Sequence, residues 1–143
     1  KWQIRIAAGQ RLDFSQKDVR LEGHAIECRI NAEDPEQDFR PSCGKVNLLH
    51  IPGGPWVRFD TALYQEYKIP PYYDSMIGKL VVYAKTREEA IRKLQAALCE
   101  LVIEGVKHNA QLHVSLLGDA RFKLGEYYTD FMATRNGSSP VRF

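Results

Sequence analysis

Apolar and polar side chains alternate along several short stretches of this chain, and that period of two predicts strands because successive side chains point to opposite faces. In residues 24–31 the alternation puts Glu27 and Arg29 together on one exposed face. Residues 45–50 follow the same pattern and predict another strand. Residues 76–83 form a nearly continuous apolar run, which is typical of a strand buried in the centre of a sheet.

Two helices are expected after these strands. Thr86 and Glu89 form a capping box, in which the Thr86 hydroxyl accepts from the Glu89 N–H and the Glu89 side chain reaches back. Apolar residues then recur with helical spacing, so the pattern predicts a helix that ends near Gly105. Asn109 is expected to cap a second helix that ends at Gly118. Separate strands followed by two packed helices indicate an α+β fold with a mostly antiparallel sheet.

The remaining segments set the expected domain limits. Residues 119–125 are expected to form a polar loop, and residues 127–132 form a last short aromatic element. We therefore expect one domain over residues 1–132. Residues 133–143 are expected to form a flexible tail, because glycine, serine and proline gather there.

The segment 51–80 gathers glycine and proline residues around a single arginine, Arg58. A Gly-Gly-Pro sequence precedes it and suits a loop that is held in one shape. Alternation then places Arg58 and Asp60 together on the polar face of a short strand. Because a guanidinium matches carboxylates, bicarbonate or a developing oxyanion, Arg58 is the strongest candidate for chemistry. The simpler interpretation is a surface arginine paired with Asp60 or Glu27.

Two further motifs suggest binding rather than catalysis. Residues 70–73 match PPxY, a polyproline ligand of small peptide-binding domains, although the segment leads directly into the predicted buried strand. Asn31, Glu33 and Asp34 offer the hard oxygen ligands that Mg²⁺ prefers. No phosphate-binding loop lies near them, so a solvated turn is the simpler interpretation. The four histidines are too scattered to form a metal cluster, and we predict no metal ligand in this chain.

Composition narrows the possible classes of function. The 20 basic and 18 acidic residues are spread along 143 residues, without the basic stripe of a nucleic-acid-binding protein. No apolar run approaches the roughly 20 residues that span a membrane. Cys28, Cys43 and Cys99 form no CxxC pair, which favours reduced thiols and a cytoplasmic location. We therefore expect neither a nucleic-acid partner nor a membrane partner.

Five motifs, taken in order, resemble the C-terminal domain of biotin carboxylase, the ATP-dependent subunit of acetyl-CoA carboxylase. These motifs are GHAIECRINAEDP, FRPSCGKV, PGGPWVRFDT, PPYYDSMIGKL and EGVKHN. The resemblance covers residues 2–132 and looks most like the bacterial acetyl-CoA form, which acts in fatty acid synthesis. Carboxylases of pyruvate and propionyl-CoA carry variants of the same domain.

The resemblance implies a reaction in which ATP and bicarbonate give carboxyphosphate, whose CO₂ is captured by N1′ of biotin on the biotin carboxyl carrier protein. It also implies Mg²⁺, upstream ATP-grasp domains that hold the nucleotide and the metal, and a homodimer. Arg58 matches the arginine expected at the biotin and bicarbonate site. Its implied role is to hold the biotin ureido oxygen and to stabilise the enolate formed when biotin is deprotonated. Thr129 and Asp130 fall where a short segment is expected to lie against the adenine of ATP.

The ATP-grasp domains are missing from this sequence, which opens at Lys1 without an initiator methionine and already in helical rhythm. We therefore expect a piece of a longer enzyme that on its own neither hydrolyses ATP nor carboxylates biotin. The alternative is a non-catalytic interaction or oligomerisation domain that uses the same fold to pack against another protein.

Overall fold

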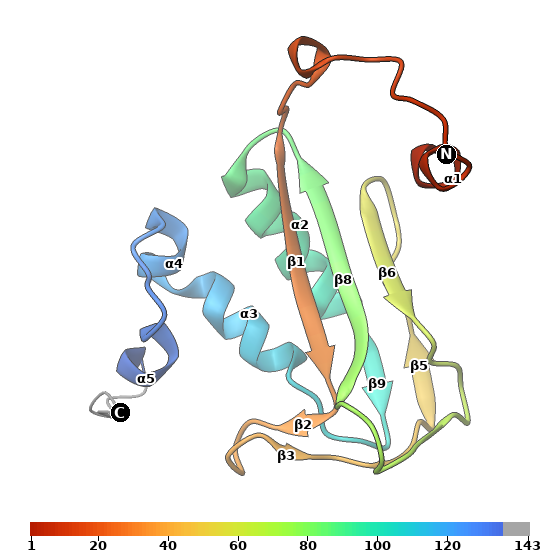
Figure 1. Ribbon diagram of the computed structural model, residues 1–143. Coiled ribbons are helices and arrows are strands. Elements are labelled where there is room, and N and C mark those ends of the chain that lie inside the picture. Colours follow the sequence, from red (N-terminus) through yellow and green to blue (C-terminus); the bar gives the residue numbers. More distant parts are fainter. Residues whose placement is uncertain (136–143) are drawn as a thin grey trace.

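The computed structural model describes residues 1–135, and its centre is an antiparallel sheet of three strands (Figure 1). These strands are β1 (His24–Asn31), β8 (Met76–Ala84) and β6 (Val57–Thr61), with β8 in the middle. The alternating stretches form β1 and β6, and the apolar run forms the central strand, as the sequence predicts. The predicted α+β class with a mostly antiparallel sheet is confirmed.

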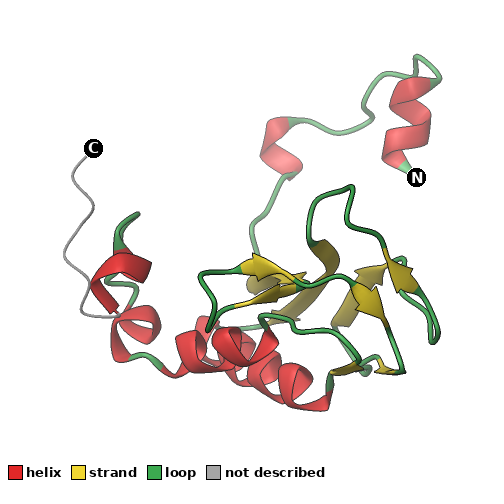
Figure 2. Ribbon diagram, turned by 90° about the horizontal axis from the view of Figure 1, so that it is seen from below, coloured by secondary structure: helices red, strands yellow, loops and turns green. Residues whose placement is uncertain are grey.

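The helices that follow β8 in the chain lie along one face of this sheet, and the N-terminal helices lie away from that face (Figure 2). The longest, α2 (Arg87–Glu100), packs against β8 and β1. Ile30, Leu80 and Leu94 are fully buried between the sheet and this helix and form the centre of the core. Burial of side chains of this size contributes about 1.5–3 kcal/mol each. The polar side chains of the alternating strands occupy the opposite face.

In the part of the chain that the structure describes, three two-stranded ladders extend the fold beyond the central sheet. They pair β2 (Glu33–Asp34) with β3 (Arg40–Pro41), β4 (Gly44–Lys45) with β7 (Lys68–Ile69), and β5 (Leu48–His50) with β9 (Val102–Glu104). The single strand predicted over residues 45–50 is therefore wrong, because its two ends pair with different partners. Val46 between them is fully buried, whereas Leu48 is exposed.

The other helices form an N-terminal arm and a C-terminal cluster (Figure 1). They are α1 (Trp2–Ala7), the 3₁₀ helix η1 (Gln16–Asp18), α3 (Ala110–Gly118), α4 (Ala120–Leu124) and α5 (Phe131–Arg135). In the cluster, α3 packs against α2 and β1, and α4 packs against α3. Within residues 1–135, no helix has both the length and the apolar character needed to cross a membrane.

The helix α2 begins where the sequence predicts and ends earlier. The Thr86 hydroxyl accepts a hydrogen bond from the Glu89 N–H at 3.2 Å, and the Glu89 carboxylate accepts from the Thr86 N–H at 3.3 Å. The helix ends at Glu100 because Leu101 is extended, at φ −67° and ψ 118°, and the residues after it pair with β5 as β9. The apolar pattern that predicts one helix to Gly105 therefore combines a helix and a strand.

The C-terminal cluster differs from the prediction in its caps. The helix α3 begins after Asn109, but the Asn109 side chain does not cap it and bonds to the backbone of β1 instead. The loop predicted over residues 119–125 is wrong. Asp119 accepts from the Arg121 N–H at 2.9 Å and thereby caps α4.

The predicted division into a domain over residues 1–132 and a flexible tail over residues 133–143 stays a prediction. The helix α5 includes residues 133–135. Residues 136–143 lie outside the residues that the structure describes.

Candidate functional site

The exposed face of the central sheet carries two rows of side chains, and each row crosses all three strands. Residues paired across antiparallel strands point to the same face. The first row is Arg29 on β1, Lys79 on β8 and Asp60 on β6, and the second row is Glu27, Val81 and Arg58. We call these six residues the open face. Its two central members are half-buried, and the other four are exposed.

Arg58 lies on the open face, as the sequence predicts, and forms an ion pair with Asp60. The Arg58 Nη2 and Asp60 Oδ2 atoms are 3.0 Å apart, and 71% of the Arg58 side chain is exposed. The loop before it bends sharply, because Trp56 has a φ of +62°, in the left-handed region that is rare for bulky residues. Asp60 neutralises part of the charge that would attract an anionic ligand. The catalytic role of Arg58 and its contact with biotin and bicarbonate stay predictions.

Arg29 has a different environment at the other edge of the open face. Its side chain is exposed, and within residues 1–135 it has no salt-bridge partner. Lys79 stands next to it in the first row and adds a second positive charge. Neighbouring strands lie about 4.8 Å apart and the two rows are about 6.7 Å apart along the strands, so the backbones of Arg29 and Arg58 are separated by about 12 Å. The alternation in the sequence puts Arg29 on an exposed face, but no local signal distinguishes it from other surface arginines.

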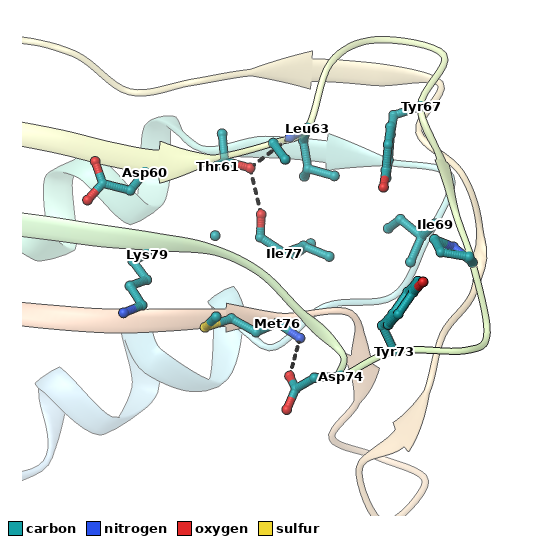
Figure 3. Close-up of a pocket in the computed structure, with 13 residues that line it drawn as sticks. Asp60, Thr61, Leu63, Tyr67, Ile69, Tyr73, Asp74, Met76, Ile77 and Lys79 are labelled. Carbon is teal, nitrogen blue, oxygen red and sulfur yellow. Dashed lines mark hydrogen bonds between the residues drawn. The ribbon is translucent and has the colours of Figure 1, made fainter.

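A pocket of about 540 Å³ opens beside the first row, where β6 ends and β8 begins (Figure 3). Asp60 and Lys79 lie at one end of it, and Tyr67 and Tyr73 lie at the other. The apolar side chains that line the space between these ends include those of Leu63, Ile69 and Ile77. A volume of this size accommodates a small ligand, and charged groups at one end can orient it.

The PPxY motif forms part of the rim of this pocket. It follows β7, and its tyrosines Tyr72 and Tyr73 are 84% and 82% exposed. After the motif, the Asp74 Oδ1 accepts from the Met76 N–H at 2.7 Å and fixes the start of β8. A segment held at both ends cannot extend freely into the groove of a peptide-binding domain, so the geometry does not favour that role.

The residues considered as Mg²⁺ ligands are arranged as a local hydrogen-bond network. Asp34 is buried as the second residue of β2, and its Oδ1 accepts from the Glu36 N–H at 3.0 Å, so the expectation of a solvated turn is wrong for this residue. The Glu33 carboxylate accepts from the Asn31 Nδ2 at 3.3 Å and from the Ser75 hydroxyl. Among the described residues, no group of three or more His, Cys, Asp and Glu side chains is arranged to hold a metal ion.

Thr129 and Asp130, predicted on the adenine side of ATP, lie between α4 and α5. Both are exposed, and the Asp130 carbonyl accepts from the Thr134 N–H at 3.0 Å in the first turn of α5. Figure 1 shows α5 beyond α3, past the β1 edge of the central sheet, whereas β6 forms the other edge. Arg58 and these two residues therefore do not share one local site within the domain, and their contact with the nucleotide stays a prediction.

Burial changes the pKa of three groups near the core. Burial, with a smaller effect of the Glu27 carboxylate, raises the pKa of the Cys28 thiol to about 12. Cys28 is therefore protonated at neutral pH and is no candidate nucleophile. Burial also lowers the pKa of His108 and His113, while hydrogen bonds to backbone carbonyls act in the opposite direction. Both rings are therefore neutral near pH 7.

Known proteins match almost the whole of the described domain. The family model for the biotin carboxylase C-terminal domain matches residues 27–134. The biotin carboxylase of Haemophilus influenzae is 55% identical over 125 residues, which are 87% of this chain and 28% of that protein. A pyruvate carboxylase subunit of Methanothermobacter thermautotrophicus is 48% identical over 132 residues, which are 92% of this chain and 27% of that protein.

A solved structure shares the fold. The biotin carboxylase domain of the Hydrogenobacter thermophilus 2-oxoglutarate carboxylase, a dimer in complex with MgADP, ADP and bicarbonate, matches with a TM-score of 0.92 and 44% identity. The match covers 94% of this chain and 30% of that one. The chain thus spans less than a third of the length of these three relatives. The resemblance found in the sequence is confirmed, and the chain belongs to the family of biotin carboxylase C-terminal domains.

Proposed function

We propose that this chain serves as the C-terminal domain of a longer, ATP-dependent biotin carboxylase and that its open face is one wall of the site where biotin is carboxylated. The observation that carries this proposal is the row formed by Arg29, Lys79 and Asp60 beside the pocket. Cationic side chains mounted on strands stabilise developing negative charge without reorganising, which is the largest single contribution in many enzymes.

The proposed reaction transfers CO₂ from bicarbonate to N1′ of biotin through carboxyphosphate, with conversion of ATP to ADP and phosphate. Biotin supplies the nucleophilic nitrogen, and its ureido oxygen becomes more negative as that nitrogen loses its proton. A guanidinium that donates to this oxygen favours the charged form. Arg29 fits this task without rearrangement, because no residue of the described part of the chain pairs with it. Arg58, which the sequence favours, has to leave Asp60 first.

We infer that ATP and Mg²⁺ bind mainly to ATP-grasp domains elsewhere in the protein, with Thr129 and Asp130 near the adenine. The relative solved with MgADP and bicarbonate extends well beyond the matched region, which is 30% of that chain, and so has room for such domains. The expected partners are the biotin carboxyl carrier protein and a second copy of the enzyme, since the same relative is a dimer. Three free thiols, at Cys28, Cys43 and Cys99, fit the reducing cytoplasm.

The final acceptor of the carboxyl group is proposed to be acetyl-CoA, in fatty acid synthesis, on the resemblance of RINAEDP and PPYYDSMIGKL to that form. The second candidate is the same domain of a pyruvate-type carboxylase. Relatives named for pyruvate and 2-oxoglutarate carboxylation share 48% and 44% identity with this chain and favour it. Assays of the assembled carboxylase with acetyl-CoA and with pyruvate distinguish the two.

The proposed function is tested by incorporation of radiolabelled bicarbonate into free biotin. The complete protein that carries this domain should catalyse the reaction only with ATP, and the isolated chain should neither carboxylate biotin nor hydrolyse ATP. A complete protein that folds, binds its partners and shows no biotin-dependent reaction would contradict the proposal. That result would favour the non-catalytic interaction domain.

A further inference from the structure

A single asparagine at the start of α3 holds the outer edge of β1. The Asn109 Oδ1 accepts from the Asn31 N–H at 2.9 Å, and the Asn109 Nδ2 donates to the Arg29 carbonyl at 3.2 Å. The Asn109 backbone N–H donates to the Asn31 carbonyl at 3.2 Å. Asn109 is 7% exposed and bonds to β1 as a residue of a neighbouring strand would.

A second residue of α3 reaches the same carbonyl group. The His113 Nε2 lies 2.9 Å from the Arg29 carbonyl oxygen, so this oxygen has two donors. Burial lowers the pKa of His113, so the ring is neutral at pH 7 and donates through its Nε2–H. We call Asn109 and His113 the β1 clamp.

The β1 clamp acts on the part of the strand that carries Arg29. Alternate residues of an edge strand direct their N–H and C=O groups outward, so Ala25 and Glu27 face the same edge. Within residues 1–135 neither of them forms a hydrogen bond of this kind. If the β1 clamp served only to cover the exposed edge of the sheet, hydrogen bonds to Ala25 and Glu27 would be equally useful.

We propose that Asn109 and His113 position Arg29 for the reaction by fixing the strand backbone from which its side chain extends. The Arg29 guanidinium has no salt bridge within the described residues, so its direction depends on that backbone. A misplacement of about 1 Å at a reacting group can lower a rate by about 10²-fold. The inference rests on the proposed function and adds two residues that act through Arg29 without touching the substrate.

The first test is Asn109→Asp in the complete enzyme. This variant keeps the acceptor for the Asn31 N–H and turns a carboxylate oxygen toward the Arg29 carbonyl in place of a donor. We expect kcat for biotin carboxylation to fall by about 10–100-fold, because Arg29 is displaced. The informative quantity is the ratio of biotin carboxylation to the ATP hydrolysis measured without biotin, and this ratio should fall. A purely structural role would lower both rates together and leave the ratio unchanged.

His113 supplies a second, milder test of the β1 clamp. His113→Leu removes one donor and should lower the same ratio, whereas His113→Gln retains an amide N–H and should recover most of it. Thr86→Ala is the matched control, because it removes the cap of α2 and leaves the edge of β1 untouched. That variant should change thermal stability but not the ratio.

Combination with Arg29→Ala separates this inference from the proposed function. If the β1 clamp acts through Arg29, Asn109→Asp should lower the carboxylation rate of the Arg29→Ala enzyme by less than twofold. If the losses caused by Asn109→Asp and Arg29→Ala are additive, the positioning role is wrong and the proposed function stands. The same holds if the ratio of carboxylation to ATP hydrolysis is unchanged in both Asn109→Asp and His113→Leu. A normal rate in Arg29→Ala itself would overturn the proposed function of Arg29 together with this inference.

Discussion

Gly78 gives the strongest prediction about packing in the central sheet. An added Cβ at this position would lie 2.4 Å from Cζ and 2.7 Å from Cε2 of the Phe59 ring. Carbon atoms in contact normally lie about 3.5–4.0 Å apart, so the ring would have to move by roughly 1 Å. Phe59 packs against the core and pairs with Leu80 on the same strand as Gly78, so the space for that movement is small.

Two opposing effects set the size of the change for Gly78→Ala. An alanine in a strand is favoured over glycine by about 0.5–1 kcal/mol. Overpacking of a well-packed site costs about 1–3 kcal/mol, so we expect a net loss of about 1–2 kcal/mol. For a chain of this size each kcal/mol corresponds to about 2–4 °C in Tm. Urea unfolding and thermal unfolding of the same protein measure both quantities.

Matched variants show whether the Phe59 ring causes the loss. Gly53→Ala is the control, because an added Cβ there meets nothing within 4 Å and should change stability by less than about 0.5 kcal/mol. Phe59→Leu in the Gly78→Ala background should recover part of the loss, with a coupling of at least about 0.5 kcal/mol. A Gly78→Ala protein as stable as the original would refute the close approach of the ring.

Two further predictions concern titratable groups. A disulfide-exchange reagent should modify the exposed Cys43 and Cys99 well before Cys28, whose pKa burial raises to about 12, and equal rates for all three would contradict that burial. Because burial lowers the pKa of His108 and His113, the unfolded chain binds more protons than the folded one once the pH falls through about 6.5. The free energy of unfolding should therefore decrease below that pH, and the urea midpoint of His108→Gln should fall less on acidification than that of the original protein. An equal fall of the two urea midpoints would contradict the lowered pKa of His108.

Features encoded by neighbouring residues could be predicted from the sequence. The alternation in β1 and β6 and the capping box at Thr86 depend on contacts within a few residues, and each forms as predicted. The predicted end of α2 near Gly105 is wrong because β9 exists only through its pairing with β5, a distant segment of the chain. Hydrophobic spacing cannot distinguish one more helical turn from a short strand that pairs with such a segment.

The candidate site has the same division between local and distant information. Asp60 as the partner of Arg58 follows from strand alternation, and the sequence offers it as the simpler interpretation. The favourable environment of Arg29 could not be predicted, because Asn109 and His113 lie 80 and 84 residues away in the chain. The sequence therefore shows which face carries the charges and offers a partner for Arg58, but it does not show how the strand that carries Arg29 is held.

The proposed function makes Arg29 on the open face the source of the positive charge that biotin carboxylation needs. The most direct measurement compares the rates of ATP-dependent biotin carboxylation of Arg29→Ala and Arg58→Ala in the complete enzyme, with folding verified by circular dichroism. We predict a loss of about 10²–10³-fold for Arg29→Ala, as for removal of a preorganised donor, and a loss below about tenfold for Arg58→Ala. A large loss for Arg58→Ala with a near-normal rate for Arg29→Ala would contradict the role of Arg29 and support the role that the sequence predicts for Arg58.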